Sequence, residues 1–197
     1  VSDGFDRADS ASLGSSWTAS AGSFGISGGQ AVNGTSGVSI ALLSGYSKAD
    51  AYVEADIDIA ANSGKSVGLF ARYSAAGYYR VDVVATATGR QAQLWVYTPA
   101  GGAMMLGSAN LGSAAGTLRL EVVGSSQKVF FNGSLVLFAS DSRVTGAGTV
   151  GIKAGGPVGT ALDNVSANEI LAAAALPFGD TFSTAVAGQL DSSRWTE

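Results

Sequence analysis

The sequence predicts an all-β protein, an antiparallel β-sandwich of about a dozen strands. Composition is the first observation, because 46% of the 197 residues are hydrophobic and only 13% are charged, with 28 glycines and 3 prolines. Such a mixture is typical of strands joined by tight turns. Apolar and polar residues also alternate along several stretches, as they do in strands with one buried face. Turn sequences such as Asn132-Gly133 separate these stretches.

The expected strands run through most of the chain. Phe5, Leu13 and Trp17 come before them and are expected to anchor the core. The strands are expected at residues 24–26, 30–32, 38–43, 51–59, 67–73, 78–84, 91–97, 117–123, 128–131, 135–138, 148–153 and 161–165. Residues 128–138 should form a hairpin, because Asn-Gly favours the two-residue type I′ turn.

The four stretches between residues 51 and 97 share one design. Each has an aliphatic face, and along 51–59 the aliphatic residues alternate with the acids Glu54, Asp56 and Asp58. If the four pair as a meander, their second faces form one continuous surface of acids, arginines, amides and aromatics. On the last three stretches that surface would hold Phe70, Arg72, Tyr78, Arg80, Asp82, Trp95 and Tyr97.

One passage occurs twice, near the start and near the end of the chain. The first copy reads Asp3-Gly4-Phe5, then Leu13 and Trp17; the second reads Asp180-Thr181-Phe182, then Leu190 and Trp195. A repeat at so long a period predicts tandem modules and not a solenoid of small units. We therefore expect one module over residues 1–170, a linker over 171–177 and the truncated first strand of a following repeat over 178–197.

Composition excludes several kinds of chemistry. The chain has no cysteine and no histidine, so disulfides, thiolate metal sites and a Ser-His-Asp triad cannot form within it. A metal would have to be held by oxygens, which favours calcium. The net charge is −4, and without a Lys/Arg cluster we expect no nucleic-acid partner. We expect no membrane insertion, because no apolar run is long enough. Since no signal peptide is visible, Val1 is expected to be an internal boundary of a longer precursor.

Four short segments carry a family resemblance. They are the opening Asp-x-Phe that ends in Trp17, residues 67–72 followed by 78–80, the hairpin at 129–134 and the closing segment 162–165. In these segments the chain resembles the concanavalin A-like jelly rolls, the group of laminin G-like domains, legume lectins and family-16 glucanases. The resemblance implies a module of a repetitive extracellular protein, secreted or at the cell surface, with neighbouring repeat modules as partners.

The resemblance also implies a structural calcium ion where the first and last strands meet. In such sites a closing-strand Asp supplies its carboxylate and backbone oxygen, and other backbone oxygens come from near the N-terminus and from the Gly after the second strand. The matching positions are Asp163, Asp3 and Gly29, so Asp3 should lie beside Asp163. Calcium takes six to eight oxygens, and carbonyls of Gly-rich turns can supply several of them. The alternative is that Asp163 only caps a turn or accepts backbone hydrogen bonds.

The acids at residues 54–58 leave a catalytic alternative open. Glu54-Ala55-Asp56-Ile57-Asp58 is similar to the Glu-x-Asp-x-x-Glu of family-16 glucanases, whose first Glu is the nucleophile and whose last is the general acid. Here the last Glu is missing, and Asp58 stands near its place. The other interpretation is a solvated strand face whose charges oppose Arg72 and Arg80 across the sheet. We expect the protein not to be an enzyme.

The polar and aromatic face is the better candidate for function. The residues expected to bind a ligand there, on a concave surface, are Arg72, Tyr78, Arg80, Trp95 and Tyr97. Flat aromatic rings stack on sugars while Arg, Asp and Gln bind hydroxyls, so the expected partner is a polysaccharide or glycan. Alternatively, these side chains fill the concavity as a second packing layer or contact a neighbouring module. The expected function is a carbohydrate-binding or adhesion module; the alternatives are a structural spacer and a family-16-like hydrolase using Glu54 and Asp58.

Overall fold

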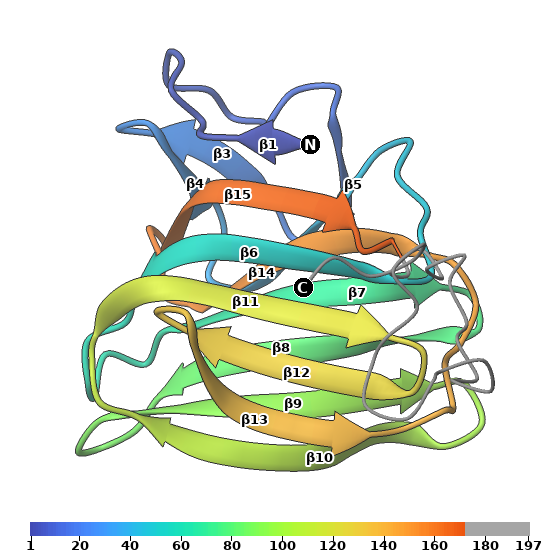
Figure 1. Ribbon diagram of the computed structural model, residues 1–197. Coiled ribbons are helices and arrows are strands. Elements are labelled where there is room, and N and C mark those ends of the chain that lie inside the picture. The colour runs from blue at the N-terminus through green and yellow to red at the C-terminus, as the bar shows by residue number, and fades with distance from the viewer. Residues whose placement is uncertain (172–197) are drawn as a thin grey trace, which may run out of the picture.

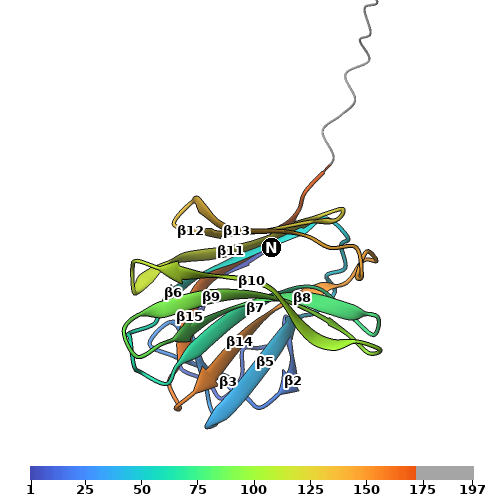
Figure 2. The same cartoon turned by 90° about the horizontal axis from the view of Figure 1, so that it is seen from below.

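The structure of the chain, a computed structural model, describes residues 1–171. These residues form two antiparallel β-sheets packed face to face (Figures 1 and 2), which confirms the predicted sandwich. No helix in this part of the chain is long and apolar enough to cross a membrane. The predicted linker, apart from Leu171, and the predicted second copy of the repeated passage lie outside the described residues.

The two sheets contain fifteen strands between them. The eight-stranded sheet lies in front in Figure 1 and runs in the order β13 (Ser134–Ser140), β12 (Ser126–Phe131), β11 (Ala115–Val123), β6 (Ala51–Asp58), β15 (Ala161–Glu169), β4 (Gln30–Asn33) and β3 (Phe24–Ser27), with β1 (Ser2–Asp3) beside β15. The seven-stranded sheet runs in the order β10 (Gly102–Leu111), β9 (Arg90–Thr98), β8 (Gly77–Ala85), β7 (Ser66–Ser74), β14 (Thr149–Gly156), β5 (Gly37–Leu43) and β2 (Trp17–Ala21).

Two strands, β2 and β10, were not expected from the sequence. β10 lies at the edge of its sheet, pairs with β9 and is mostly exposed. It therefore lacks the alternation of buried and exposed positions by which a strand is recognised.

One part of the predicted topology is wrong. β6 does not extend the meander of β7, β8 and β9, because it pairs with β11 and β15 in the opposite sheet, and the meander continues through β10. Both sheets of a sandwich turn one face to the core, so alternation alone does not show which sheet a strand joins. The acids of β6 consequently do not oppose Arg72 and Arg80; Glu54 lies opposite Arg119 and Ser166.

The core lies between the aliphatic faces of the two sheets. Val53 and Ala55 of β6 are fully buried, as are Leu69, Val81 and Leu94 of the facing sheet. The alternation predicted for residues 51–59 is confirmed, because the acids between these aliphatic residues point outward. The predicted hairpin is also present, since Asn132 and Gly133 join β12 to β13 with φ angles of 51° and 74°. Two positive φ values are what a type I′ turn requires.

The first copy of the repeated passage forms a hydrogen-bonded corner. The Asp3 carboxylate accepts hydrogen bonds from the Phe5 amide and Trp17 Nε1, each at 2.9 Å. It also accepts two from the Arg7 guanidinium, at 2.7 and 3.1 Å. Phe5 and Trp17 are buried with their ring centroids 6.1 Å apart, and β1 pairs with β15 so that Asp3 lies opposite Val165. The expected proximity of the first and closing strands is therefore confirmed.

Replacing Asp3 by asparagine is expected to weaken the acid sensitivity of the fold. Burial acts to raise the Asp3 pKa, but hydrogen bonds from Arg7, Trp17 and the Phe5 amide outweigh it, so the pKa lies below its ordinary value of 3.8. A lowered folded-state pKa adds stability above the unfolded pKa, and this stability is lost as the pH falls through the folded pKa. Urea midpoints at about pH 6 and about pH 2 should therefore differ less in Asp3→Asn than in the wild type.

The control is Asp58→Asn, which changes an exposed acid of β6. It should leave the difference between the two urea midpoints as large as in the wild type. Equal effects of the two substitutions would contradict a specific role for the Asp3 carboxylate.

Candidate functional site

The outer face of β7, β8 and β9 carries its side chains in rows that cross the strands. In the register of β8 and β9, Tyr78 lies opposite Tyr97 and Arg80 lies opposite Trp95; in the register of β7 and β8, Phe70 lies opposite Arg80. A third row runs from Gln93 through Asp82 and Gly68 to Lys153. We call this surface the tyrosine face, with the members Phe70, Tyr73, Tyr78, Arg80, Asp82, Gln93, Trp95, Tyr97 and Lys153.

Three tyrosine rings form a stack on this face. The Tyr78 ring lies between those of Tyr73 and Tyr97, with centroid distances of 4.9 and 5.0 Å and interplanar angles of 2° and 17°. Phe70 packs edge-on against Tyr73 and Tyr78. Both faces of the Tyr78 ring are therefore covered, and this ring can meet a ligand only through its edge and its hydroxyl. Only the outer two rings keep one face free of the stack.

Arg80 lies between two aromatic rings of the second row. Its guanidinium carbon is 5.9 Å from the Phe70 ring centroid and 5.8 Å from the Trp95 ring centroid. Arg80 Nε is 2.9 Å from Asp82 Oδ2, a charged contact without hydrogen-bond geometry. Burial raises the pKa of Tyr78, which the charge of Arg80 only partly offsets. The Tyr78 hydroxyl thus stays protonated at neutral pH and can both donate and accept a hydrogen bond.

A buried ion pair occupies the third row. Lys153 Nζ donates to Asp82 Oδ1 at 2.9 Å, and the side chains are 11% and 5% exposed. Gly68 of β7 lies between them, and a Cβ at that position would overlap Asp82 Oδ1. The glycine thus lets two charged side chains meet across an intervening strand. Sequence reasoning missed Lys153 and the pairing, although a glycine inside an apolar strand is a signal of close approach.

Arg72 does not belong to the tyrosine face, which corrects the expectation that it binds a ligand there. The pairing of β7 with β8 shifts between Ala71 and Ser74, and Arg72 has a φ of 53°. This bulge interrupts the alternation, so Tyr73 takes the outward position. Arg72 is 1% exposed and its guanidinium donates to the Ala49 and Val144 carbonyl oxygens and to Asp50. The other four predicted residues, Tyr78, Arg80, Trp95 and Tyr97, do lie together.

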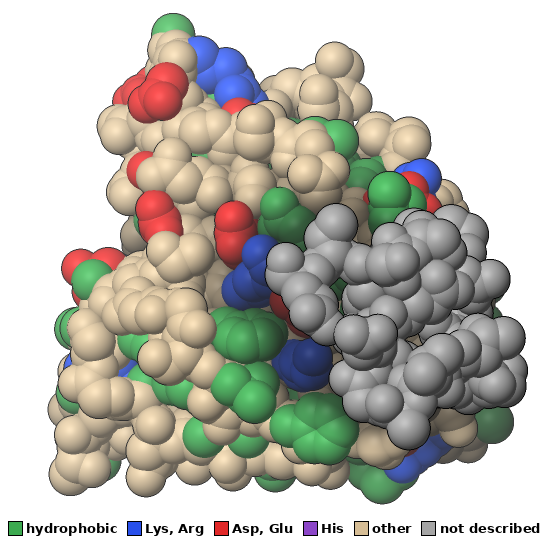
Figure 3. Space-filling model, viewed as in Figure 1, with side chains coloured by type: hydrophobic (Ala, Val, Ile, Leu, Met, Phe, Trp, Pro, Cys, Tyr) green, Lys and Arg blue, Asp and Glu red, His purple; other side chains and the backbone are tan. Residues whose placement is uncertain are grey.

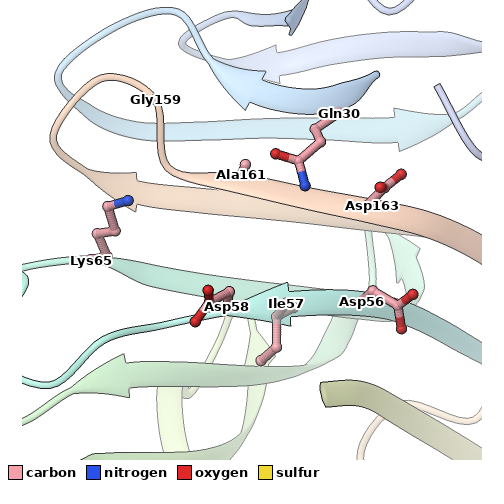
Figure 4. A pocket seen from close by; sticks show the side chains of 8 residues that line it. All are labelled: Gln30, Asp56, Ile57, Asp58, Lys65, Gly159, Ala161 and Asp163. Carbon is pink, nitrogen blue, oxygen red and sulfur yellow. The ribbon is translucent and has the colours of Figure 1, made fainter. Parts of the chain in front are cut away.

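The predicted acid cluster lies on the outer face of the other sheet. Asp56, Asp58 and Asp163 line a hollow of about 340 Å³ there, together with Gln30 and Lys65 (Figure 4). The carboxyl groups of Asp58 and Asp56 lie on β6, while Asp163 lies on β15 and Lys65 stands at one end (Figure 4). Because Gln30 and Lys65 also line it, the hollow contains an amide and a cation beside the carboxylates.

The acids of β6 are tied into hydrogen bonds with their neighbours. Asp56 accepts hydrogen bonds from Thr117 Oγ1 at 2.6 Å and Asn164 Nδ2 at 2.9 Å. Glu54 accepts one from Ser166 Oγ at 2.9 Å. These contacts fit the alternative to catalysis, a charged strand face. The hydrogen-bond partners of the acids come from β11 and β15, and not from Arg72 and Arg80 as expected.

Of the residues proposed to hold calcium, Asp3 lies opposite Val165, two residues along β15 from Asp163, but its carboxylate is engaged by Arg7, Trp17 and the Phe5 amide. The Asp6 carboxylate lies closer to Gly29: a Cβ on Gly29 would lie 3.5 Å from Asp6 Oδ1, and one on Gly4 would lie 3.1 Å from Asp6 Oδ2 and 3.4 Å from Asn164 Oδ1. Asp163 Oδ1 accepts the Asn164 amide at 2.7 Å. Within residues 1–171, no three acidic side chains gather as they would around a metal.

The fold and its outer faces define a class: a two-sheet jelly roll of concanavalin A-like type with an aromatic and charged outer face. The chain is similar to the carbohydrate-binding module CBM66 from Bacillus subtilis, with 23% identity over 80% of this chain and 98% of that chain and a TM-score of 0.63. It is similar to an endo-β-1,3-glucanase from Pyrococcus furiosus, with 12% identity over 88% of this chain and 94% of that chain and a TM-score of 0.66. It is also similar to a LamA variant from Z. galactanivorans in complex with laminaritriose and laminaritetraose, with 12% identity over 85% of this chain and 95% of that chain and a TM-score of 0.56.

No protein-family model and no curated protein matches the sequence. At these identities the structural likenesses establish the jelly-roll fold, which the opening, hairpin and closing segments of the sequence had indicated. One fold of this kind serves both binding modules and hydrolases.

Proposed function

We propose that the chain is a carbohydrate-binding module whose ligand site is the tyrosine face. The main observation behind this proposal is the row of Tyr73, Tyr78 and Tyr97 beside Arg80. It places phenol hydroxyls next to the Arg80 guanidinium, which packs against Trp95, on one sheet face. The similarity to a carbohydrate-binding module over nearly that module's whole length supports the same assignment.

The ring stack determines how such a ligand would be bound. The covered faces of Tyr78 leave its hydroxyl as the contact group, so recognition rests on hydrogen bonds at this position. Tyr97, at the end of the stack, can add ring contact to its hydroxyl. Sugar hydroxyls both donate and accept hydrogen bonds. Phenol hydroxyls can do the same and a guanidinium donates, so these groups complement a sugar.

Substitutions of Tyr97 distinguish the hydrogen bond of its hydroxyl from the contact of its ring in one experiment. Affinity electrophoresis in gels containing β-1,3-glucan, xylan, galactan or fructan is expected to retard the wild type on at least one polysaccharide. On that polysaccharide, Tyr97→Phe should weaken binding by about 2- to 10-fold, the value of one hydrogen bond, and Tyr97→Ala by more than about 10-fold because the ring is lost too. Val158→Ala changes an exposed side chain of a distant loop and should bind like the wild type.

The same experiment tests the second candidate function, a structural spacer. The stacked rings and buried Phe70 favour it, because they resemble a second packing layer. A wild-type protein that none of the four polysaccharides retards would overturn the binding proposal and support the spacer.

We infer that the module does not cleave its ligand. The carboxylates of the glucanase-like passage lie on the sheet opposite the tyrosine face and cannot reach a sugar bound there, and Glu54 and Asp56 accept hydrogen bonds from neighbouring side chains. Incubation with β-1,3-glucan should therefore release no reducing ends. Release that disappears in Glu54→Gln would establish the hydrolase instead.

A structural calcium ion between the first and closing strands remains a proposal, with Asp6 in place of Asp3. Its ligands would be Asp6, Asp163 and carbonyl oxygens near Gly29, and the ion would fasten β15 to the N-terminal segment. Oxygen-only ligands of this kind suit calcium. We further propose that the module works outside the cell, in a repetitive adhesive protein with neighbouring repeat modules; the repeated Asp-x-Phe passage supports this.

Calcium is expected to raise the melting temperature of the wild-type chain. An ion that binds only the folded state stabilises by about 2.7 kcal/mol at a hundredfold excess over its dissociation constant. Asp6→Asn and Asp163→Asn should abolish the difference between melts in calcium and in EDTA, while Asp58→Asn should keep it. Identical wild-type melts in the two buffers would rule out the site.

A further inference from the structure

The outer face of the eight-stranded sheet carries a second organised row of side chains. Ser166 lies opposite Glu54, Glu54 opposite Arg119, Arg119 opposite Phe130 and Phe130 opposite Leu135, each on a neighbouring strand. The row therefore passes from polar residues on β15 and β6 to apolar residues on β12 and β13. It lies on the opposite side of the sandwich from the tyrosine face.

Arg119 in the middle of this row is held in one orientation. Its guanidinium carbon lies 3.7 Å from the Tyr52 ring centroid, so the group packs against the face of the ring. Arg119 Nε and Nη2 donate to Glu121 Oε2 at 3.1 and 2.9 Å, and Nη1 donates to Glu54 Oε2 at 3.5 Å. Ser166 Oγ fixes the other oxygen of Glu54. A ligand that meets these groups would find them already ordered, which lowers the entropic cost of binding.

The row borders a hollow of about 290 Å³. Its lining comprises Glu54, Thr117, Arg119, Glu121, Phe130 and Gly133. The volume lies just below the range of roughly 300–1,000 Å³ for small-molecule sites, so the hollow suits one or two rings of ligand. Apolar, basic and acidic side chains gather beside one another on this face of the molecule (Figure 3).

Spare hydrogen-bonding capacity in the hollow indicates the chemistry of the ligand. Three of the five N–H groups of Arg119 are used in the bonds above, and within residues 1–171 Glu121 Oε1 accepts no hydrogen bond. Donors and an acceptor are thus available side by side, next to the ring of Phe130. Since Arg119 is balanced by Glu54 and Glu121, no strong cationic charge is left to select an anion. A neutral ring with adjacent hydroxyls on its edge and C–H groups on its face matches this set.

We propose that this hollow is a second carbohydrate site, for a neutral pyranose unit, with Phe130 under the sugar ring and Arg119 and Glu121 on neighbouring hydroxyls. The module then has a site on each of its two outer faces and can hold two chains at once. The proposal does not depend on the tyrosine face, because the two sites share no residue.

Chemical-shift mapping on the whole chain tests both sites separately. The ¹⁵N-labelled protein is titrated with laminaritriose, xylotriose and cellotriose in turn. At least one trisaccharide is expected to shift the amides of residues 117–121 and 128–133. Shifts confined to residues 78–97 would overturn the second site and leave the first; shifts confined to 117–133 would do the reverse; and no shift at 117–133 with any of the three overturns this proposal.

Variants then assign the contacts. Arg119→Ala and Phe130→Ala should each raise the dissociation constant read from residues 117–133 by at least about tenfold. Tyr97→Ala should leave that constant unchanged. Phe138→Ala is the matched control for Phe130→Ala, because Phe138 is a 61% exposed aromatic of the adjacent strand outside the hollow. Equal effects of the two phenylalanine variants would contradict stacking on Phe130.

Discussion

Replacing Arg72 by methionine is expected to lower the free energy of unfolding by about 2–6 kcal/mol, because two inward carbonyl groups lose their donor at about 1–3 kcal/mol each. The side chain is 1% exposed, and it donates to the Ala49 and Val144 carbonyl oxygens and to Asp50. Methionine fills much of the same volume but donates nothing. Two inward carbonyl groups then lose their partner, and each costs part of its desolvation energy.

Arg72 also connects three parts of the chain. The Ala49 and Asp50 contacts lie just before β6 and the Val144 contact lies in the segment between β13 and β14, so one side chain of β7 links both sheets. Tyr79 holds the same segment, because its hydroxyl donates to Asp141 at 2.8 Å. Burial and this hydrogen bond raise the pKa of Tyr79 to about 12. The segment between β13 and β14 is thus fastened by two buried side chains.

Urea unfolding followed by tryptophan fluorescence measures the Arg72→Met effect. Arg143→Met is the matched control: Arg143 pairs with Asp141 at 2.9 Å but is 41% exposed. The Arg143 guanidinium is largely solvated, and the buried Asp141 carboxylate keeps its hydrogen bonds from the Tyr79 hydroxyl and the Arg143 amide, so the loss in Arg143→Met should stay below about 1 kcal/mol. A loss below 1 kcal/mol in Arg72→Met as well would show that the buried guanidinium is not needed to hold the two sheets together.

Alternation predicted strands well because it records burial at each position. Residues 51–59 and 78–84 show this, since every second side chain enters the core. The sheet to which a strand belongs depends on contacts far away in sequence, and β6 was therefore assigned to the wrong meander. β10 was missed because an exposed edge strand does not need alternating apolar residues.

The candidate site was predictable where the strand geometry stayed regular. Tyr78, Arg80, Trp95 and Tyr97 are two residues apart on adjacent strands, so simple alternation brings them together. Arg72 lies within a bulge, where one extra residue turns the next side chain to the other face. The pattern of residue types contained no signal for that bulge, and Tyr73 was consequently overlooked.

The second large effect is expected at the ion pair beneath the tyrosine face. Lys153→Met should lower the free energy of unfolding by about 3 kcal/mol, at the lower end of the range for a broken buried pair, because Arg80 still contacts the Asp82 carboxylate. Asp82→Leu should cost about as much, since it leaves Lys153 and Arg80 together without their anion. Both values come from the same urea titrations.

A double-mutant cycle shows whether these losses come from the pair itself. Asp82→Leu combined with Lys153→Met removes both charges and leaves apolar side chains on either side of Gly68. Replacing a whole buried pair by apolar groups is often neutral, so the double variant should be more stable than the sum of the single losses implies, with a coupling of about 1–3 kcal/mol. Strict additivity would mean that Asp82 and Lys153 do not interact across Gly68. The pair lies beside Gln93 and Trp95, so the double variant should also bind polysaccharide more weakly although it is folded. Weaker binding by a folded variant separates the contribution of these charges to binding from their contribution to stability.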